Sequence, residues 1–367
     1  MPGGTEKAKE YNKIRLRLKL ANLSFIFAFL ILFQIFLSGP LAALSFSTAP
    51  NFYVSLAAYT VIFSFIHYVL SFPLHFYSGF ALEHRFNLSN QNIFDWVKDE
   101  IKGGALTLAI FLIFVQALYI LLRNSGSIWW VWMAGFWFAV TVILAKITPL
   151  VIIPLFFKYS PVDRNLKDKV LGLSAKCGIT NVLDVFEINF SKKTNKINAA
   201  LTGLGKSRRV ILADNLIKDF TEEEVSGVLA HEFAHHRLKH IWKSIVFGAA
   251  STLTSFYALY LVSRRLVAFF KADSIYDIRI LPAFLLIIFL AGFLIMPLQN
   301  GFSRRMEKEA DRFALKVTQN KNAFVSLMEK LAAKNLSDPN PPTLVKFWFY
   351  DHPPVSERIN FAKNYKS

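Results

Sequence analysis

The chain has 367 residues, of which 54% are hydrophobic, 15% aromatic and only 18% charged, and its formal net charge is +17. Soluble globular proteins carry about 25% charged residues. This deficit, together with a mean hydropathy of +0.37, excludes a disordered or fibrous chain and argues against an ordinary cytosolic enzyme. A protein that crosses a membrane several times is the expected class.

In chain order, the first elements that the sequence predicts are membrane-spanning helices, each of which needs about 20 apolar residues. Six segments meet this requirement: Leu20–Leu37, Phe52–Phe72, Ala105–Leu122, Ile128–Ile147, Ile245–Val262 and Ile280–Leu298. Pro149 and Pro154 lie near the end of the fourth segment, where they should kink or stop the helix.

The distribution of Lys and Arg predicts the orientation of these spans, because both residues concentrate on the cytoplasmic side. The first 19 residues hold six cations and the next connection, Ser38–Asn51, holds none, so we expect a cytoplasmic N-terminus. A second connection is expected at Pro73–Gly104, and four spans return the chain to the cytoplasm at Lys158. The basic loop Arg264–Arg279 disagrees with this pattern. Anionic lipid explains the net charge, and no nucleic acid partner is expected.

The region after the fourth span predicts a small soluble α+β unit. An alternating stretch, Val182–Phe190, is typical of a strand, and Lys196–Thr202 and Arg209–Ala213 flank the turn-prone Gly203–Ser207, which predicts a hairpin. The expected fold class is an all-α multi-span membrane protein with about six transmembrane helices and a small α+β cytoplasmic domain carrying a β-hairpin. We expect four regions: 1–157 with four spans, 158–224 as the soluble segment, 225–300 with spans five and six, and 301–367 as a C-terminal helical region.

A metal-binding pattern follows the soluble segment. Thr221 and Glu224 form a capping box that opens a helix, and this helix carries His231-Glu232-Phe233-Ala234-His235. Positions four apart share a helix face, so both imidazoles can reach one ion, while Glu232 can address a water on it as general base. Catalytic zinc takes three protein ligands and leaves the fourth position to water. The alternative is a chance pattern, which arises on the order of 1% of the time in a chain of this length.

The third ligand is expected where span six returns to the same side of the membrane. In the helix after Leu298, one face carries Glu307 and, one turn later, Asp311. Glu307 is therefore the better third ligand, because Glu309 lies on the far flank, and Asp311 could hydrogen bond a ligand histidine. Alternatively, Glu307 and Asp311 are ordinary solvated carboxylates.

The other histidines give weaker signals. His236 and His240 are expected on the same helix as the metal-binding pattern but pointing away from it, in surface or lipid-interface positions. His67 lies inside the second span, where an interhelical hydrogen bond is as good an interpretation as function. His352, at a proline-rich turn, would alone be an unremarkable loop histidine.

Three separated motifs resemble the membrane-embedded CAAX prenyl protease family, a type of zinc metallopeptidase. They are His231-Glu232-x-x-His235, Ser303-Arg304-x-x-Glu307-x-x-x-Asp311 and His352-Pro353-Pro354-x-x-Glu357-Arg358. Asn198-Ala199, before Lys206–Ile211, also resembles the substrate-binding strand of that family.

The resemblance implies one zinc ion per chain, held by His231, His235 and Glu307, with Glu232 activating water. It further implies roles for Asp311 as a partner of a ligand, for His352 and Arg358 at the oxyanion of the transition state, and for Asn198 and Ala199 in backbone hydrogen bonds to an extended peptide. Such proteins form a ring of helices around an intramembrane chamber with the zinc site at its cytoplasmic end. The implied activity is removal of the C-terminal tripeptide from prenylated proteins.

Other functions stay open at this point. A general membrane-protein quality-control metalloprotease would use the same residues on substrates that are not prenylated. Non-enzymatic alternatives are a transporter and an inactive scaffold. The resemblance places the protein in the endoplasmic reticulum membrane of a eukaryote or the plasma membrane of a bacterium. Cys177 is the single cysteine, so no oxidising compartment is implied, and the sequence gives no indication of the oligomeric state.

Overall fold

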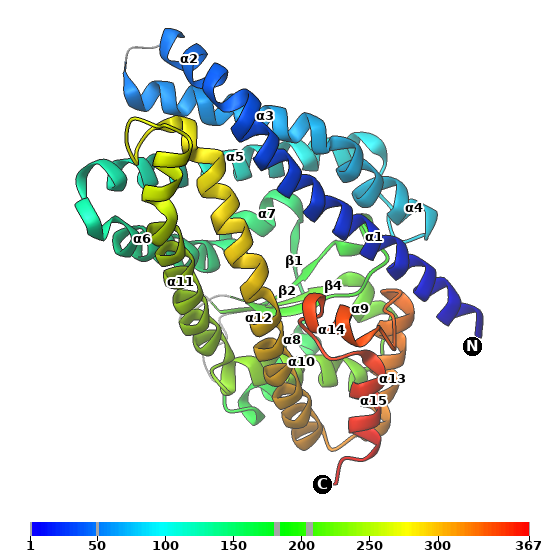
Figure 1. The fold of residues 1–367 in the computed structure, drawn as a ribbon. Helices are drawn as coiled ribbons and strands as arrows, with labels where there is room; N and C mark the ends of the chain where they lie inside the picture. Colours follow the sequence, from blue (N-terminus) through cyan, green and yellow to red (C-terminus); the bar gives the residue numbers. More distant parts are fainter. Residues whose placement is uncertain (1, 49–50, 180–183, 203–207, 367) are drawn as a thin grey trace.

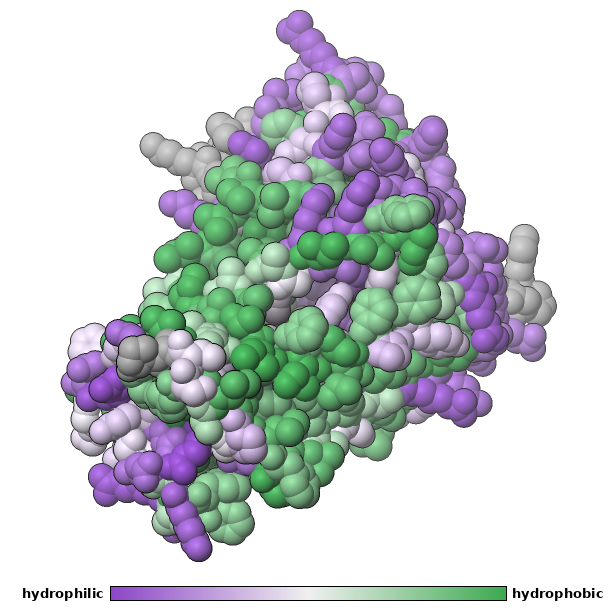
Figure 2. Space-filling model, turned by 90° about the horizontal axis from the view of Figure 1, so that it is seen from above, coloured by the Kyte–Doolittle hydropathy of each residue, from purple (hydrophilic) through white to green (hydrophobic). Residues whose placement is uncertain are grey.

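The computed structural model describes residues 2–48, 51–179, 184–202 and 208–366. Within this part of the chain, six helical segments are long and apolar enough to cross a membrane, which confirms the predicted number: Glu6–Thr48, Phe52–Arg85, Ile93–Asn124, Gly126–Phe156, His240–Phe269 and Ile278–Thr318. Figure 1 shows the N-terminus on the same side of the molecule as the C-terminal helices. Figure 2 shows a face on which apolar side chains form a broad area between polar regions at its two ends, as a membrane protein requires.

The first span differs from its prediction. It consists of α1 (Pro2–Leu32), a π-helical turn (Phe33–Leu37) and α2 (Ser38–Thr48). The prediction of a loop at Ser38–Asn51 is therefore wrong for the residues up to Thr48, which are helical. Pro40 lacks an N–H group and its ring would clash with the carbonyl one turn earlier. The wider π-helical turn just before Pro40 lets the chain continue as a helix.

The expected connection at Pro73–Gly104 is also largely helical. Helix α3 (Phe52–Phe76) continues through a π-helical turn (Tyr77–Ala81) into α4 (Leu82–Arg85), and α5 (Ile93–Asn124) begins after seven intervening residues. Asn92 caps α5, because its side chain accepts a hydrogen bond from the Asp95 N–H at 2.9 Å. Hydropathy detects only the lipid-facing part of a helix, so the turns beyond the bilayer were missed.

The remaining spans end close to their predicted positions or extend beyond them. After a 3₁₀ turn (Gly126–Ile128), α6 (Trp129–Ile147) gives way to a π-helical turn (Thr148–Ile152) and α7 (Ile153–Phe156), which confirms the interruption at Pro149. The last two spans are α11 (His240–Phe269) and α12, which follows a 3₁₀ turn (Ile278–Ile280) and comprises Leu281–Thr318. Helix α12 has 38 residues, about 57 Å of helix, so its C-terminal part projects well beyond the bilayer.

A four-stranded sheet forms the centre of the soluble part. Its strands are β1 (Tyr159–Pro161), β2 (Asp184–Ile188), β3 (Ala199–Thr202) and β4 (Arg209–Ala213), in the order β1-β2-β4-β3. Strands β3 and β4 are antiparallel, with Ala199 opposite Leu212, which confirms the hairpin, although Gly203–Ser207 lies outside the described residues. Strand β2 confirms the middle of the predicted strand Val182–Phe190. Residues 182–183 of that prediction lie outside the described residues. The short β1 was not predicted.

Helices cover this sheet and connect it to the spans. They are α8 (Arg164–Lys176), α9 (Asp214–Asp219), α10 (Glu222–Arg237), α13 (Lys321–Lys334), α14 (Thr343–Phe349) and α15 (Val355–Lys363). One core joins β4, α10 and α13 through buried side chains that include Leu212, Phe233 and Leu327. Because α10 also packs on α12, this core fixes the metal-motif helix between the edge strand β3 and the projecting end of the sixth span.

Candidate metal centre

The start of α10 is fixed by a capping box, as predicted. The Thr221 hydroxyl accepts a hydrogen bond from the Glu224 N–H at 3.3 Å, and a Glu224 oxygen accepts one from the Thr221 N–H at 2.8 Å. Lys330 and Ser326 on α13 also donate to Glu224. Burial alone would raise the pKa of Glu224, but these hydrogen bonds lower it below its ordinary value. The helix therefore begins at a defined position, about 2.5 turns before His231 and about 3.6 turns before His235.

Helices α10 and α12 bring three potential metal ligands together. His231 Nε2 lies 3.2 Å from His235 Nε2 and 3.2 Å from Glu307 Oε2, and His235 Nε2 lies 3.3 Å from Glu307 Oε1. One atom from each residue lies within 4.8 Å of the others. His231 and Glu307 are buried, at 8% and 5% exposure. The structure therefore assembles the three residues that the sequence nominated.

The spacing of these atoms suits a small cation. With metal–ligand bonds of about 2.0–2.1 Å, a tetrahedral ion holds neighbouring ligand atoms about 3.3 Å apart. In addition, Glu307 Oε2 is a buried oxygen without a hydrogen-bond partner among the described residues, and such an atom requires an explanation. A cation between the two imidazoles and the carboxylate satisfies both observations.

Asp311 and Arg358 support His231 from behind. Asp311 Oδ1 lies 2.9 Å from His231 Nδ1, which leaves Nε2 to face the centre. Arg358 donates to both Asp311 oxygens, from Nε at 2.8 Å and from Nη2 at 2.6 Å. Burial opposes ionisation of Asp311, but Arg358 and His231 hold its pKa well below the usual range. The carboxylate is thus charged and fixed, as expected of a group that orients a metal ligand.

The carboxylates at the centre favour a positive charge on or next to His231. Although burial acts in the opposite direction, the nearby carboxylates of Asp311 and Glu307 raise the pKa of His231 to about 9. Burial, with the adjacent His231, lowers the pKa of His235 to about 4. The two carboxylates therefore attract one positive charge, which a proton or a metal cation can supply.

His352 reaches the centre from the turn between α14 and α15. Its Nε2 lies 3.4 Å from Glu307 Oε1, and its Nδ1 lies 2.9 Å from Asp351 Oδ1. Two side chains of α12 hold this turn, because Asn300 donates to the Trp348 carbonyl and Arg304 to the Tyr350 carbonyl. The same helix that carries Glu307 thus positions His352, whose side chain is 53% exposed and can meet a substrate.

His236 lies on α10 as predicted, but His240 does not, and the prediction of surface or lipid-interface positions is wrong for both. Lys239 has a φ of 57° and separates α10 from α11, so His240 does not follow the helical spacing of α10. It is 1% exposed, its Nδ1 lies 3.1 Å from His235 Nδ1, and its Nε2 lies 3.0 Å from Glu309 Oε2. His236 Nε2 lies 3.1 Å from the Leu201 carbonyl of β3. Both histidines therefore belong to the surroundings of the site, not to the lipid interface.

The edge strand β3 lies beside the centre. Asn198 accepts a hydrogen bond from the Ala213 N–H at 3.2 Å through its carbonyl, so its backbone faces β4. Backbone groups alternate in direction along a strand, so those of Ala199 face the open edge.

Glu232 lies on α10 between the two histidines. Burial raises the pKa of Glu232, an effect that the neighbouring His231 opposes. The centre thus combines a carboxyl group beside the potential metal ligands with the edge strand of the sheet, where α10 contacts Leu201 and the backbone of Ala199 faces outward.

Two family models together match most of the chain. Residues 161–366 match Peptidase family M48, and residues 4–158 match the CAAX prenyl protease N-terminal model, described as five membrane helices. The crystal structure of S. mikatae Ste24p superimposes with a TM-score of 0.84 at 23% identity, covering 98% of this chain and 88% of that one. This superposition shows that the two proteins share a fold.

Curated relatives give the same assignment. CAAX prenyl protease 1 of Saccharomyces cerevisiae is 31% identical over 317 residues, which cover 79% of this chain and 68% of that protein. An uncharacterised metalloprotease of Bacillus subtilis, YhfN, is 28% identical over 86% of this chain and 75% of its own length. The chain therefore belongs to peptidase family M48 and is an integral membrane metalloprotease that resembles the CAAX prenyl proteases.

Proposed function

We propose that the chain is a zinc endopeptidase that cleaves an extended peptide and removes the C-terminal tripeptide of prenylated proteins. The carrying observation is the spacing of 3.2–3.3 Å among the nitrogens of His231 and His235 and the oxygens of Glu307. Nitrogen and oxygen ligands at tetrahedral spacing suit zinc, and we assign one ion per chain. A bound zinc ion supplies Lewis-acid polarisation of a substrate carbonyl and of water.

The residues around the ion have distinct proposed roles. Glu232 accepts a proton from the attacking water and delivers it to the leaving amine, a function that a raised pKa assists. His352, exposed at the edge of the site, and Arg358, fixed by Asp311, provide positive charge for the developing oxyanion. Asp311 keeps His231 in the tautomer that presents Nε2.

The substrate is proposed to bind by strand addition at β3. An extended peptide that pairs with an open sheet edge gains main-chain hydrogen bonds without a required sequence. Ala199 offers its backbone groups at this edge, and the exposed side chain of Asn198 lies next to it. His236, which is bonded to Leu201, attaches the strand to α10 and thereby to Glu232.

We further propose that the N-terminus and the metal centre lie on the cytoplasmic side. The six cations of the first 19 residues favour this orientation. From the resemblance to the CAAX prenyl proteases, we propose the endoplasmic reticulum membrane of a eukaryote or the plasma membrane of a bacterium.

Cleavage of a farnesylated CAAX peptide and of its unprenylated counterpart tests this proposal. The full-length protein in detergent or nanodiscs should release the tripeptide from the farnesylated peptide preferentially. Glu232→Gln should lower the rate by about 10²–10⁴-fold while zinc stays bound, because Glu232 is not among the ligands. Equal turnover of both peptides would instead support a general membrane-protein quality-control protease. Full activity of Glu232→Gln would contradict the assignment of the base.

A further inference from the structure

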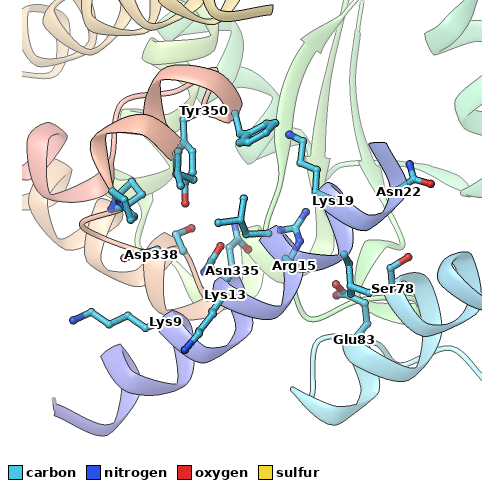
Figure 3. Close-up of a pocket in the computed structure, with 18 of the residues that line it drawn as sticks. Lys9, Lys13, Arg15, Lys19, Asn22, Ser78, Glu83, Asn335, Asp338 and Tyr350 are labelled. Atoms are coloured by element: carbon cyan, nitrogen blue, oxygen red, sulfur yellow. The ribbon is translucent and has the colours of Figure 1, made fainter. Parts of the chain in front are cut away.

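A cleft of about 980 Å³ separates the N-terminal helix from the C-terminal segment. One wall is α1, a second is the end of α3 with its π-helical turn, and the third is formed by residues 335–351. Figure 3 shows Arg15 and Lys19 pointing from α1 toward Tyr350, while Lys9 and Lys13 extend along the other end of the same helix. Four cations from one helix thus line a single cavity.

The carboxylates that line this cleft contact other groups more closely than they contact its cations. Among the described residues, no ion pair joins Lys9, Lys13, Arg15 or Lys19 to a carboxylate. Glu83, on the opposite wall, is 2.7 Å from Lys196 and also accepts a hydrogen bond from Tyr11.

The two carboxylates of the C-terminal wall are also engaged. Asp351 is 2.9 Å from His352, and Asp338 accepts a hydrogen bond from the Asn340 N–H. Asp351 also attracts Lys19 electrostatically, but four cations line the α1 side of the cleft, and an anion there would be stabilised.

The position of the cleft along the spans indicates which kind of anion. The apolar run of α1 begins at Leu20, directly after Lys19, and that of α3 ends at Phe72, two residues before the lining residue Leu74. Two antiparallel spans thus contribute to the cleft just beyond the hydrocarbon, at the depth of lipid headgroups. Leu20 and Phe72, 46% and 38% exposed, continue both walls into the apolar zone, where acyl chains lie.

We infer that this cleft binds the phosphate of an anionic phospholipid, with Arg15 and Lys19 as the main contacts. Arg15 offers a bidentate fork for phosphate oxygens and Lys19 a point charge. Lys19, whose Nζ lies 4.5 Å from the centre of the Phe349 ring, places one cation against the C-terminal wall. Lipid bound here would join the first span to the segment that carries His352. The inference does not depend on the proposed substrate.

Lipid binding to the full-length protein in detergent tests the inference directly, without any measurement of cleavage. Short-chain phosphatidylglycerol should bind more tightly than phosphatidylcholine of the same chain length. The double variant Arg15→Gln/Lys19→Gln should weaken phosphatidylglycerol binding by about 30-fold, since each cation near an anionic lipid contributes about a factor of five. The control Lys316→Gln/Lys366→Gln removes the same charge from exposed positions elsewhere and should bind like the wild type.

The charge-retaining variant Arg15→Lys/Lys19→Arg distinguishes loss of charge from misfolding as the cause of weaker binding. It should preserve most of the binding. Equal affinity of the wild type and Arg15→Gln/Lys19→Gln would overturn the inference, as would equal affinity for the two lipids. Glycerol 3-phosphate that binds as tightly as phosphatidylglycerol would show a site for free phosphate compounds. An acidic peptide that displaces the lipid at lower concentration would show a peptide site. Either of these last results also overturns the assignment to lipid.

Discussion

His231 and His235 each have a supporting group behind the nitrogen that does not face the centre. For His231 the support is Asp311, which is in direct contact. For His235 it is His240, which in turn contacts Glu309, and Lys243 lies 3.2 Å from the same carboxylate. Groups of this kind fix the orientation of a ligand and strengthen metal binding. The arrangement predicts that His240 and Glu309 act on the metal through His235.

Replacement of Glu309 should therefore weaken the metal site. We expect Glu309→Gln to lower zinc affinity by about 10–100-fold, and His240→Ala to have a larger effect because it also leaves a space beside His235. A competition titration with a chromophoric chelator measures the affinity independently of cleavage. Glu329→Gln, which removes an exposed carboxylate from α13, is the control. Unchanged affinity in both His240→Ala and Glu309→Gln would show that the contacts are structural only.

The positions of the metal-site residues could be predicted from the sequence wherever the chain keeps regular helical geometry. The spacing of His231 and His235 and the face shared by Glu307 and Asp311 follow from an uninterrupted helix. His240 could not be placed in this way, because the left-handed conformation of Lys239 redirects the chain and nothing in the residue type predicts it. The contact between Arg358 and Asp311 joins positions 47 residues apart and depends on how α15 packs on α12.

At the scale of elements, the N-terminus of α10 depends on Glu224. The carboxylate is 3% exposed, lies 2.7 Å from Lys330, and accepts the hydrogen bond that closes the capping box. Glu224→Gln should destabilise the protein at pH 7 by about 1.5–3 kcal/mol, because hydrogen bonds to a charged group contribute that much. Thermal unfolding of the full-length protein in detergent measures the loss.

The same variant gives a prediction for pH. The pKa of Glu224 is lower in the folded protein than its ordinary value, so its contribution is complete above the unfolded pKa of about 4.3 and disappears as the pH falls through the lower folded pKa. The difference in melting temperature between wild type and Glu224→Gln should therefore be constant over roughly pH 6 to 8. It should shrink at acidic pH. A difference that grows on acidification would contradict this linkage.

Elements embedded in lipid were predicted more reliably than those in water. Each span needs a long apolar run, so composition reveals it, whereas the ends of α3 and α12 continue as helices with polar faces that hydropathy does not detect. The strands of the hairpin flank the turn-prone Gly203–Ser207 and were found for that reason. Strand β1 has only three residues and is specified by its antiparallel pairing with β2, a contact that the local sequence does not encode.

At the scale of the whole molecule, the orientation in the membrane can be tested with single cysteines. The native Cys177 is buried and should not react. Lys7→Cys and Lys366→Cys should react with a membrane-impermeant maleimide from the cytoplasmic side only, and Lys271→Cys, which follows α11, from the opposite side only. Sealed vesicles of known orientation distinguish these cases. Labelling of Lys7→Cys and Lys271→Cys from the same side would refute the proposed topology.

The soluble sheet, the end of the sixth span and the C-terminal turn meet at one metal centre, so the number of zinc ions bound per chain tests the account most directly. Elemental analysis of the purified full-length protein should give about one zinc for the wild type and for the control Glu329→Ala, because a single tetrahedral site is expected. Glu307→Ala should lose most of that zinc, since it removes one of three ligands. The same zinc content in all three proteins would contradict the convergence of His231, His235 and Glu307 on one ion.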